Sequence, residues 1–286
     1  MIRLVAIDID GTLLDSHGRI PQRNLRAIED AVARGTDVVL VTGRSFPFAL
    51  PVARQLPPAV ALIVSNGALE RTQDGMTLAS RLLPVAEAAD LLAATTAFRH
   101  CAALIFDRDA AGQIVADTMD WDVSNRKPYW LRNRHLIART TPLEGALTED
   151  PVELMFNGTV AEMRVLAERL AGLPGQFAVA LTEYENRDFT ILDVTAPAAT
   201  KGEALAQRAA ALGIGREQVM AIGDNLNDVG MLDFAGCPVL MGNAAPALRA
   251  RPWALTASHD EAGVAEAMDR FITFSPTSAD RTAGPR

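Results

Sequence analysis

Short apolar runs alternate with helical patterns over the first 65 residues, and this alternation constrains the fold of the chain most strongly. Residues 4–7, 37–41 and 60–65 have the length and composition of strands that are buried on both faces. Between the first two runs, residues 21–34 carry apolar side chains at helical spacing and end at Gly35. A strand, a helix and a strand in this order predict βαβ units, and therefore a doubly wound parallel sheet.

A different pattern interrupts the α/β alternation in the middle of the chain. Strand-like and helix-like segments with hairpin signals follow one another there, which is typical of an α+β unit. After Thr200 the first pattern resumes, with further strands expected at 219–222 and 238–241. We therefore expect a Rossmann-like α/β core at residues 1–83 and 186–274, an inserted α+β domain at 84–185, and a flexible tail at 275–286.

The charge balance limits the partners that this chain can bind. The 286 residues include 35 Asp and Glu against 27 Lys and Arg, a formal net charge of −8 that repels nucleic acid and anionic membranes. A lysine or a metal ion can still reverse the sign inside one pocket. No stretch has the ~20 apolar residues of a membrane span, and Cys101 and Cys237 do not make a disulfide framework. We expect a cytoplasmic monomer or homodimer that binds neither nucleic acid nor a membrane.

Two carboxylates follow the first predicted strand, at the edge where open parallel sheets bind ligands. Asp8 and Asp10 are separated by one residue and followed by Gly11. Such a pair can hold a hard cation such as Mg²⁺, and one carboxylate can attack an electrophile while the other handles a proton. A solvated turn rich in Asp and Gly has the same composition, so the motif alone leaves both interpretations open.

Two more motifs suit an anion. Thr42 and Gly43 follow the second predicted strand, and a hydroxyl beside exposed amides can hold phosphate oxygens as well as cap a helix. Lys201 stands at the start of a predicted helix, where the helix dipole disfavours a cation. Binding of an anion would explain a lysine at this position, although an isolated lysine more often points into water.

The fourth motif, GDNLND at residues 223–228, again follows an apolar strand. It offers two carboxylates and two carboxamides at the same edge of the predicted sheet. Asp224 could complete a metal site, and Asp228, about one helical turn later, could support its neighbours. A helix cap at Asp224 or Asn225 is the alternative.

In this order along the chain, the motifs resemble those of the haloacid dehalogenase (HAD) superfamily, and most closely the Cof-type phosphatases with a C2B cap. The matching stretches are 8–14 (DIDGTLL), 42–44 (TGR), 65–68 (SNGA), 201–202 (KG), 223–228 (GDNLND) and 241–244 (MGNA). The resemblance implies a Mg²⁺-dependent phosphatase that acts on small phosphorylated metabolites, above all sugar phosphates, through an aspartyl-phosphate. The inserted domain would be a cap that closes over the site and carries specificity.

The resemblance also implies a role for each matching residue. Asp8 would be the nucleophile and Asp10 the general acid and base. Mg²⁺ would be bound by the side chains of Asp8 and Asp224 and by the backbone carbonyl of Asp10. Asp228 would support these ligands without touching the ion. The phosphoryl group would be held by Ile9, Thr42, Gly43, Lys201 and Asn227. Arg44 and Asn66 would lie at the substrate rim.

Other functions remain open at this point. A phosphotransferase or phosphomutase acting on sugar phosphates would use the same aspartyl-phosphate, and a non-catalytic regulator would bind a sugar phosphate without turnover. Residues 121–139 interleave basic and aromatic side chains, which could bind nucleic acid or line the cap beside a leaving group. An amphipathic cap surface is the favoured interpretation of that stretch.

Overall fold

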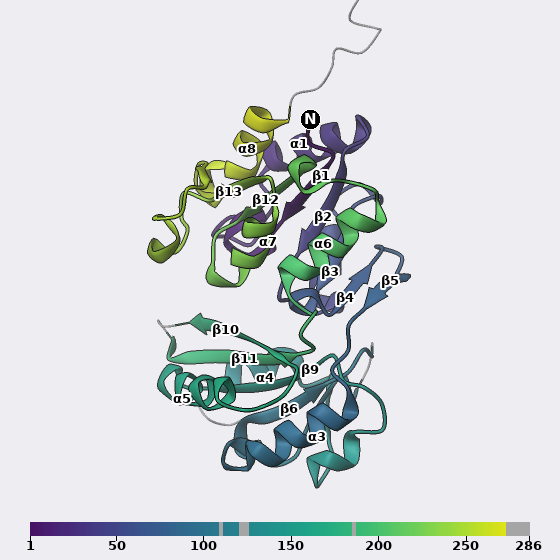
Figure 1. The fold of residues 1–286 in the computed structure, drawn as a ribbon, viewed down its shortest axis with the longest axis vertical. Coiled ribbons are helices and arrows are strands. Elements are labelled where there is room, and N and C mark those ends of the chain that lie inside the picture. The colour runs from purple at the N-terminus through teal and green to yellow at the C-terminus, as the bar shows by residue number, and fades with distance from the viewer. Residues whose placement is uncertain (109–110, 120–125, 185–186, 273–286) are drawn as a thin grey trace, which may run out of the picture.

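The computed structural model describes residues 1–108, 111–119, 126–184 and 187–272, which form two domains, each built on one sheet (Figure 1). The first sheet has eight strands in the order β14-β13-β12-β1-β2-β3-β4-β5. Their bounds are β1 Leu4–Ile7, β2 Asp37–Val41, β3 Ala61–Val64, β4 Leu69–Arg71, β5 Thr77–Ser80, β12 Val219–Gly223, β13 Cys237–Leu240 and β14 Ala254–Leu255. From β14 to β3 neighbouring strands are parallel, whereas β4 and β5 pair in antiparallel fashion at one edge. The predicted doubly wound parallel core is confirmed.

Helices cover both faces of the first sheet because its strands are apolar on both sides. In β1, Val5 and Ile7 belong to one buried cluster, and Leu4 and Ala6 belong to another. The first cluster includes residues of α1 (Gln22–Ala33), α2 (Phe46–Ala53) and α8 (Gly263–Phe271). The second includes residues of α6 (Lys201–Ala211) and α7 (Val229–Phe234).

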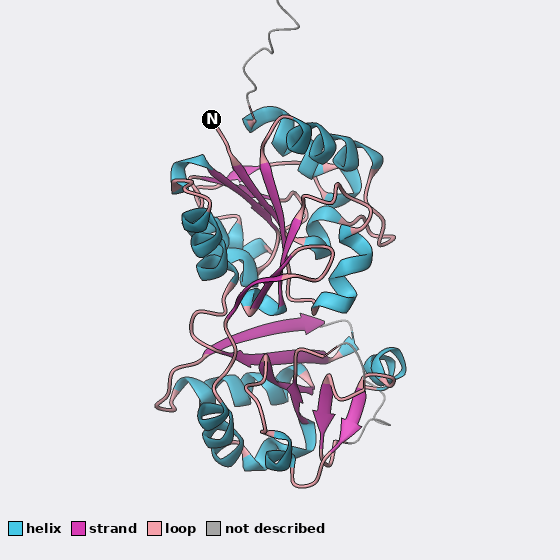
Figure 2. Cartoon of the chain, turned by 90° about the vertical axis from the view of Figure 1, so that its right-hand side faces the viewer, coloured by secondary structure: helices cyan, strands magenta, loops and turns pink. Residues whose placement is uncertain are grey.

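The second sheet has six strands in the order β10-β11-β9-β6-β7-β8. Their bounds are β6 Ala102–Ile105, β7 Ile114–Ala116, β8 Ile137–Arg139, β9 Glu153–Gly158, β10 Ala178–Tyr184 and β11 Phe189–Thr195. The helices of this domain are α3 Val85–Ala94, α4 Lys127–Asn133 and α5 Val160–Ala171. Helices α3 and α5 lie on the side of the sheet that is remote from the first domain (Figures 1 and 2). The other face of the sheet is therefore turned toward the first domain.

The period of two along the strands decides which side chains face the first domain. On β9, Leu154 and Phe156 are buried in the cluster formed with α3 and α5. Glu153 and Met155, which alternate with them, line a cavity between the domains. The second domain, which is the predicted cap, therefore contributes every second residue of such strands to the cavity. This part of the lining is called the cap-side wall.

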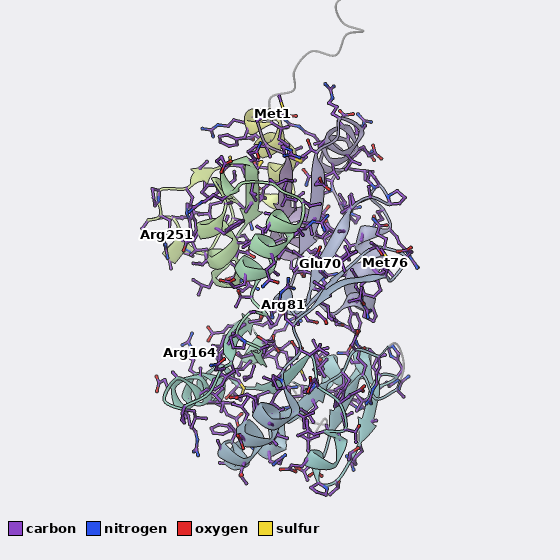
Figure 3. All side chains as sticks on the ribbon, turned by 45° about the vertical axis from the view of Figure 1, so that its right-hand side comes forward. Met1, Glu70, Met76, Arg81, Arg164 and Arg251 are labelled. Carbon is purple, nitrogen blue, oxygen red and sulfur yellow. The ribbon has the colours of Figure 1, made fainter. Side chains whose placement is uncertain are left out.

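The chain passes twice between the domains, and hydrogen bonds fix both passages. At the first, the buried Arg81 donates from Nη1 to the carbonyl of Gly67 (3.0 Å) and from Nε to Oε1 of Gln207 (2.8 Å). Figure 3 shows Arg81 at the junction of the two domains. At the second, Oγ1 of Thr195 donates to the carbonyl of Ala199 (3.1 Å).

The predicted end of the inserted domain at residue 185 is wrong, because β11 belongs to the second sheet. It pairs with β10 on one side and β9 on the other, from Phe189 to Thr195. A strand buried on one face of a cap and a strand buried in the core have similar apolar runs, so composition did not separate them. The expected tail at 275–286 lies outside the described residues.

Helix α3 ends at Ala94, where the buried hydroxyl of Thr95 donates back to the carbonyl of Leu91 (2.7 Å) and a tighter turn follows. Within the described ranges, no helix combines the length and apolar character that crossing a membrane would require.

Candidate active site

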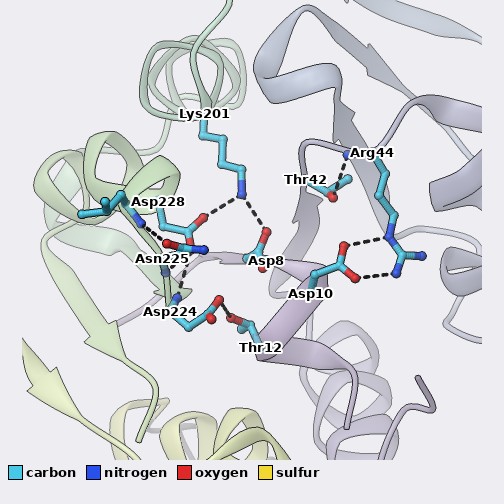
Figure 4. Close-up of polar contacts among 10 residues, drawn as sticks. Asp8, Asp10, Thr12, Thr42, Arg44, Lys201, Asp224, Asn225 and Asp228 are labelled. Carbon is cyan, nitrogen blue, oxygen red and sulfur yellow. Dashed lines mark hydrogen bonds and ion pairs between the residues drawn. The ribbon is translucent and has the colours of Figure 1, made fainter. Parts of the chain in front are cut away.

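Three parallel strands and one helix bring the predicted residues to one edge of the first sheet (Figure 4). Asp8 directly follows β1, Thr42 follows β2, and Asp224 follows β12. Lys201 is the first residue of α6. The carboxyl ends of neighbouring parallel strands lie together, so residues far apart in the sequence meet here.

Lys201 is the centre of a buried ion cluster. Its ammonium nitrogen lies 2.7 Å from Oδ1 of Asp8 and 2.7 Å from Oδ1 of Asp228. Only 1% of the lysine side chain is exposed, so neither ion pair is weakened by water to the degree of a surface pair. The alternative of a solvent-exposed lysine is wrong.

Close packing of two helices places Lys201 beside Asp228. A Cβ atom on Gly202 would lie 2.6 Å from the backbone carbon of Gly230 in α7, a distance that no side chain tolerates. Because position 202 is glycine, α6 approaches α7 closely enough for the lysine to reach Asp228. The Lys-Gly pair of the sequence thus has a steric reason as well as a chemical one.

Asp228 organises the loop that carries Asp224. Its Oδ2 accepts hydrogen bonds from the amides of Asp224 and Asn225, both at 3.0 Å, while its Oδ1 accepts from Lys201. Gly223 is required here, because a Cβ would lie 2.7 Å from the Asp228 side chain. Asp228 therefore positions Asp224 and Asn225, as its location about one helical turn later in the sequence suggested.

The carboxylates of this cluster crowd one another. One oxygen from each of Asp8, Asp224 and Asp228 lies within 4.8 Å of the other two. Burial raises the pKa of Asp8 well above its ordinary value, and the charges of Asp228 and Asp224 add to this effect, although Lys201 opposes it. Burial and the charge of Asp228 raise the pKa of Asp224 to about 6. Three carboxylates facing a single ammonium group leave an excess of negative charge.

The donor set fits a hard divalent cation. Both oxygens of Asp228 are already engaged, so Asp8 and Asp224 are the carboxylates that could ligate an ion. Thr12 holds Asp224 in place by donating from Oγ1 to its Oδ1 (3.1 Å). Gly11 leaves room for that carboxylate, since a Cβ there would lie 2.4 Å from Oδ2 of Asp224. Oxygen ligands of this kind are those that Mg²⁺ prefers.

Asp10 points to a different partner. Its carboxylate receives two hydrogen bonds from Arg44, from Nε at 2.8 Å and from a terminal nitrogen at 2.6 Å (Figure 4). The side chain of Asp10 is 61% exposed, and both residues line the cavity with Asp8. The hydrogen bond to Asp10 raises the pKa of Arg44. Asp10 is therefore held at the mouth of the site rather than inside the ion cluster.

The expected phosphate-binding residues surround the same opening. Thr42, Gly43 and Asn227 line the cavity beside Asp8. Oγ1 of Thr42 accepts the amide hydrogen of Arg44 (3.1 Å), which leaves the hydroxyl hydrogen available to an anion. The Oδ1 atom of Asn227 is buried without a partner among the described residues. The side chain of Ile9 is buried in the core, so only its backbone could contribute, and that role stays a prediction.

Asn66 lies behind the cavity wall, beside a residue that lines the cavity. It is 5% exposed, and its Nδ2 donates to Oδ2 of Asp193 on β11 (3.2 Å). The residue adopts a left-handed backbone with φ of 54°, which asparagine tolerates better than most residues. Asn66 therefore links the first domain to the second, behind the cavity wall.

The cavity between the domains has a volume of about 350 Å³. The second domain also lines this cavity, with residues whose function the sequence did not indicate. They include Gln113, Asn133, Glu153, Met155, Thr182, Tyr184, Ile191 and Asp193. One signal was available: Glu153 and Asp193 are acids within largely apolar strands. Of the stretch 121–139, the positions 121–125 lie outside the described residues, while Tyr129 and Arg132 of α4 line the cavity.

A second group of potential metal ligands, His100, Cys101 and Glu162, is explained by hydrogen bonds within the protein. Nε2 of His100 lies 2.9 Å from Oε1 of Glu162, and the thiol of Cys101 donates to the carbonyl of Phe98. Burial raises the pKa of that thiol to about 12, so it is not a ready ligand. Cys101 is therefore a buried, free thiol of the core.

The fold and the site together define a hydrolase of the haloacid dehalogenase class. The chain belongs to the haloacid dehalogenase-like hydrolase family, whose sequence model matches residues 5–268. It is a HAD-type phosphatase of the Cof kind, as the motifs predicted.

Several relatives match most or nearly all of the chain. The 5-amino-6-(5-phospho-D-ribitylamino)uracil phosphatase YcsE of Bacillus subtilis is 28% identical, over 95% of this chain and 96% of its own length. The HMP-PP phosphatase of Serratia proteamaculans is 30% identical, over 87% of each chain. Among solved structures, the HAD subclass IIB sugar phosphatase BT4131 is 25% identical with a TM-score of 0.73, and the match covers 94% of this chain and 98% of that one.

Proposed function

We propose that this protein is a Mg²⁺-dependent phosphatase that hydrolyses small phosphorylated metabolites, sugar phosphates above all, through an aspartyl-phosphate on Asp8. The observation that carries the proposal is the contact of Asp8 with the buried ammonium group of Lys201, at the base of a cavity that the cap domain also lines. A relative that acts on a phosphorylated ribityl compound and a structural relative that is a sugar phosphatase support the substrate class.

The site must first offset the electrostatic repulsion between the substrate and its nucleophile. A phosphate monoester is a dianion, and it must approach the carboxylate of Asp8. Lys201 offsets part of the repulsion, and the hydroxyl of Thr42 together with the amide of Gly43 can donate to phosphoryl oxygens. Mg²⁺, held by Asp8 and Asp224, would supply the remaining positive charge when bound.

Two proton-coupled steps complete the reaction. An oxygen of Asp8 forms a bond to phosphorus while the bond from phosphorus to the leaving oxygen breaks, and Asp10 gives that oxygen a proton. A water molecule then attacks the phosphorus of the aspartyl-phosphate and gives a proton back to Asp10. The bond from Asp8 to phosphorus breaks, and inorganic phosphate and the free carboxylate of Asp8 result. Asp10 must release a hydrogen bond from Arg44 before it can carry a proton to the substrate.

We further propose that the inserted domain acts as the cap of this site. The cavity is lined from both domains, and the contact between Asn66 and Asp193 joins them at its border. A cap in this place would exclude water during phosphoryl transfer and select the leaving group.

The test is phosphate release from a panel of sugar phosphates, nucleotides and phosphorylated cofactors with Mg²⁺ present. We expect turnover in wild type, a phosphorylated protein trapped by rapid acid quench, and neither in Asp8→Asn. Circular dichroism of Asp8→Asn should match that of wild type, because the asparagine removes a buried charge without changing the volume. Transfer of the phosphoryl group to a second sugar hydroxyl without phosphate release would instead establish a phosphotransferase. Full activity in Asp8→Asn would overturn the proposed mechanism.

A further inference from the structure

The cap-side wall of the cavity holds four buried polar side chains that the proposed chemistry does not use. Gln113 precedes β7, Asn133 ends α4, Glu153 begins β9 and Asp193 lies on β11. Their exposed fractions are 4%, 3%, 8% and 6%, yet all four border the cavity. They come from four separate elements, so this is a set assembled by the tertiary fold.

Three of these side chains have an oxygen without a hydrogen-bond partner among the described residues. The atoms are Oε1 of Gln113, Oδ1 of Asn133 and Oε2 of Glu153. A buried polar atom that is left unpaired costs roughly 1–3 kcal/mol, so folded proteins rarely keep several together without a purpose. The ionised carboxylate of Glu153 can only accept, whichever way the two neighbouring amides are turned, and a ligand that donates hydrogen bonds to it favours this ionised form. The wall therefore offers acceptors to a ligand that brings hydrogens.

The charges on this wall repel one another. Burial raises the pKa of Asp193 to about 7, although the hydrogen bond from Asn66 lowers it. Burial and the charge of Asp193 raise the pKa of Glu153 well above its ordinary value. A second negative group brought into this place would add to an existing repulsion, whereas a hydroxyl or an ammonium group would relieve it. Two arginines line the same cavity: Arg44, which is paired with Asp10, and Arg132, which lies on the exposed side of α4. Because Arg132 could attract an anionic substrate from that side, its substitution is a necessary comparison.

We propose that Gln113, Asn133, Glu153 and Asp193 form a leaving-group subsite. The subsite accepts substrates that present hydroxyl or amino hydrogens to the cap, and it rejects those that carry a second anionic group there. This inference rests on the proposed phosphatase function, because it concerns the part of the substrate that leaves when the phosphoryl group is transferred. Missing hydrogen-bond partners and added like charge both penalise the wrong substrate, which is how polar sites reach high selectivity.

A pair of matched substrates tests the subsite. Sorbitol 6-phosphate and 6-phosphogluconate have the same carbon chain and differ at the end remote from the phosphate, which is a hydroxymethyl group in one and a carboxylate in the other. For wild type we expect kcat/KM to favour sorbitol 6-phosphate by about tenfold or more, the ratio that 1.4 kcal/mol produces. Phenyl phosphate, which has neither a hydroxyl nor a charge on its leaving group, serves as the reference substrate for every variant.

Variants then assign the selectivity to residues. Glu153→Gln and Asp193→Asn keep the side-chain volumes and remove the charges, and we expect each to lower the ratio several-fold and the double variant to abolish it. Asp117→Asn is the matched control, because Asp117 is a buried cap carboxylate that does not line the cavity and bonds to Thr141 instead. Its ratio should equal that of wild type.

The outcomes separate this inference from the proposed function. No turnover of any substrate, phenyl phosphate included, would mean that the phosphatase assignment fails. Turnover of phenyl phosphate with equal rates for the matched pair would overturn the subsite alone. The subsite would also be refuted if Arg132→Gln changed the ratio while Glu153→Gln left it unchanged. The wild-type ratio is decisive even if a variant does not fold.

Discussion

The ammonium nitrogen of Lys201 lies 2.7 Å from the carboxylate of Asp8, 193 positions earlier in the chain. The same nitrogen is 2.7 Å from Asp228, so one buried cation serves two carboxylates. Those charges outweigh the effect of burial and raise the pKa of Lys201, which favours its protonated form. This lysine therefore supports both the structure and the proposed chemistry.

Replacing Lys201 with Met should lower both the stability and the activity of the protein. Two buried carboxylates would lose their partner, and removing one member of a buried ion pair costs about 3–5 kcal/mol of unfolding free energy. We expect kcat/KM to fall by about a hundredfold or more, as for other lost electrostatic contacts to a developing charge. Chemical denaturation and steady-state kinetics measure the two effects. Lys201→Arg keeps the charge and should retain more stability; equal stability of Lys201→Met and wild type would contradict the role of the ion cluster.

The contact between Gly202 and Gly230 predicts a second effect. In Gly202→Ala the new Cβ would lie 2.6 Å from the backbone of α7, so α6 must move away and take Lys201 with it. Overpacking of this kind costs about 1–3 kcal/mol, and we expect lower activity with a lower melting temperature. Gly213→Ala, at a glycine with no atom within 4 Å of the new Cβ but with φ of +62°, separates backbone strain from steric contact. An active, fully stable Gly202→Ala would show that the approach of the two helices is not needed.

Removal of the divalent cation should be visible without an activity assay. If Asp8 and Asp224 hold Mg²⁺, adding the ion at a hundred times its dissociation constant would stabilise the fold by about 2.7 kcal/mol, and chelation would reverse this. We expect the melting temperature to rise with Mg²⁺ in wild type and to be insensitive to it in Asp224→Asn. An unchanged response in Asp224→Asn would remove Asp224 from the metal site.

Asp193 predicts a pH dependence of stability. Its pKa of about 7 in the folded protein exceeds the ordinary value of 3.8, so the unfolded chain releases this proton more readily. Wild type should therefore lose stability as the pH rises from about 4 to 7, by at most about 4 kcal/mol at 1.4 kcal/mol per pH unit. Asp193→Asn does not titrate, and its oxygen can still accept from Asn66.

The comparison is made by urea denaturation at pH 5 and pH 8. The stability of Asp193→Asn relative to wild type should increase by about 2.7 kcal/mol between these two values, since the wild-type loss is nearly complete once the pH passes 7. Asp117→Asn again provides a buried acid of the same domain as a control. A difference between wild type and Asp193→Asn that is the same at both pH values would show that Asp193 ionises normally.

Local sequence patterns determined the core and the family of this protein. Asp8, Thr42 and Asp224 each follow an apolar strand, and parallel strands of one sheet bring their carboxyl ends together whatever the details of packing. Lys201 was recognisable because it stands beside a glycine at the start of a helix. The family and the parallel fold predicted in this way are confirmed, whereas the catalytic roles stay predictions.

Contacts between distant segments were decided by the tertiary structure alone. The sequence did not indicate that β11 joins the second sheet, that Asn66 bonds to Asp193, or that Arg44 pairs with Asp10. A strand places alternate residues on opposite faces, and which face turns toward the first domain depends on how the whole cap packs. Local patterns report which residues are apolar or polar along one element; only the packed fold determines which buried polar groups meet, and so where Glu153 and Asp193 face the cavity.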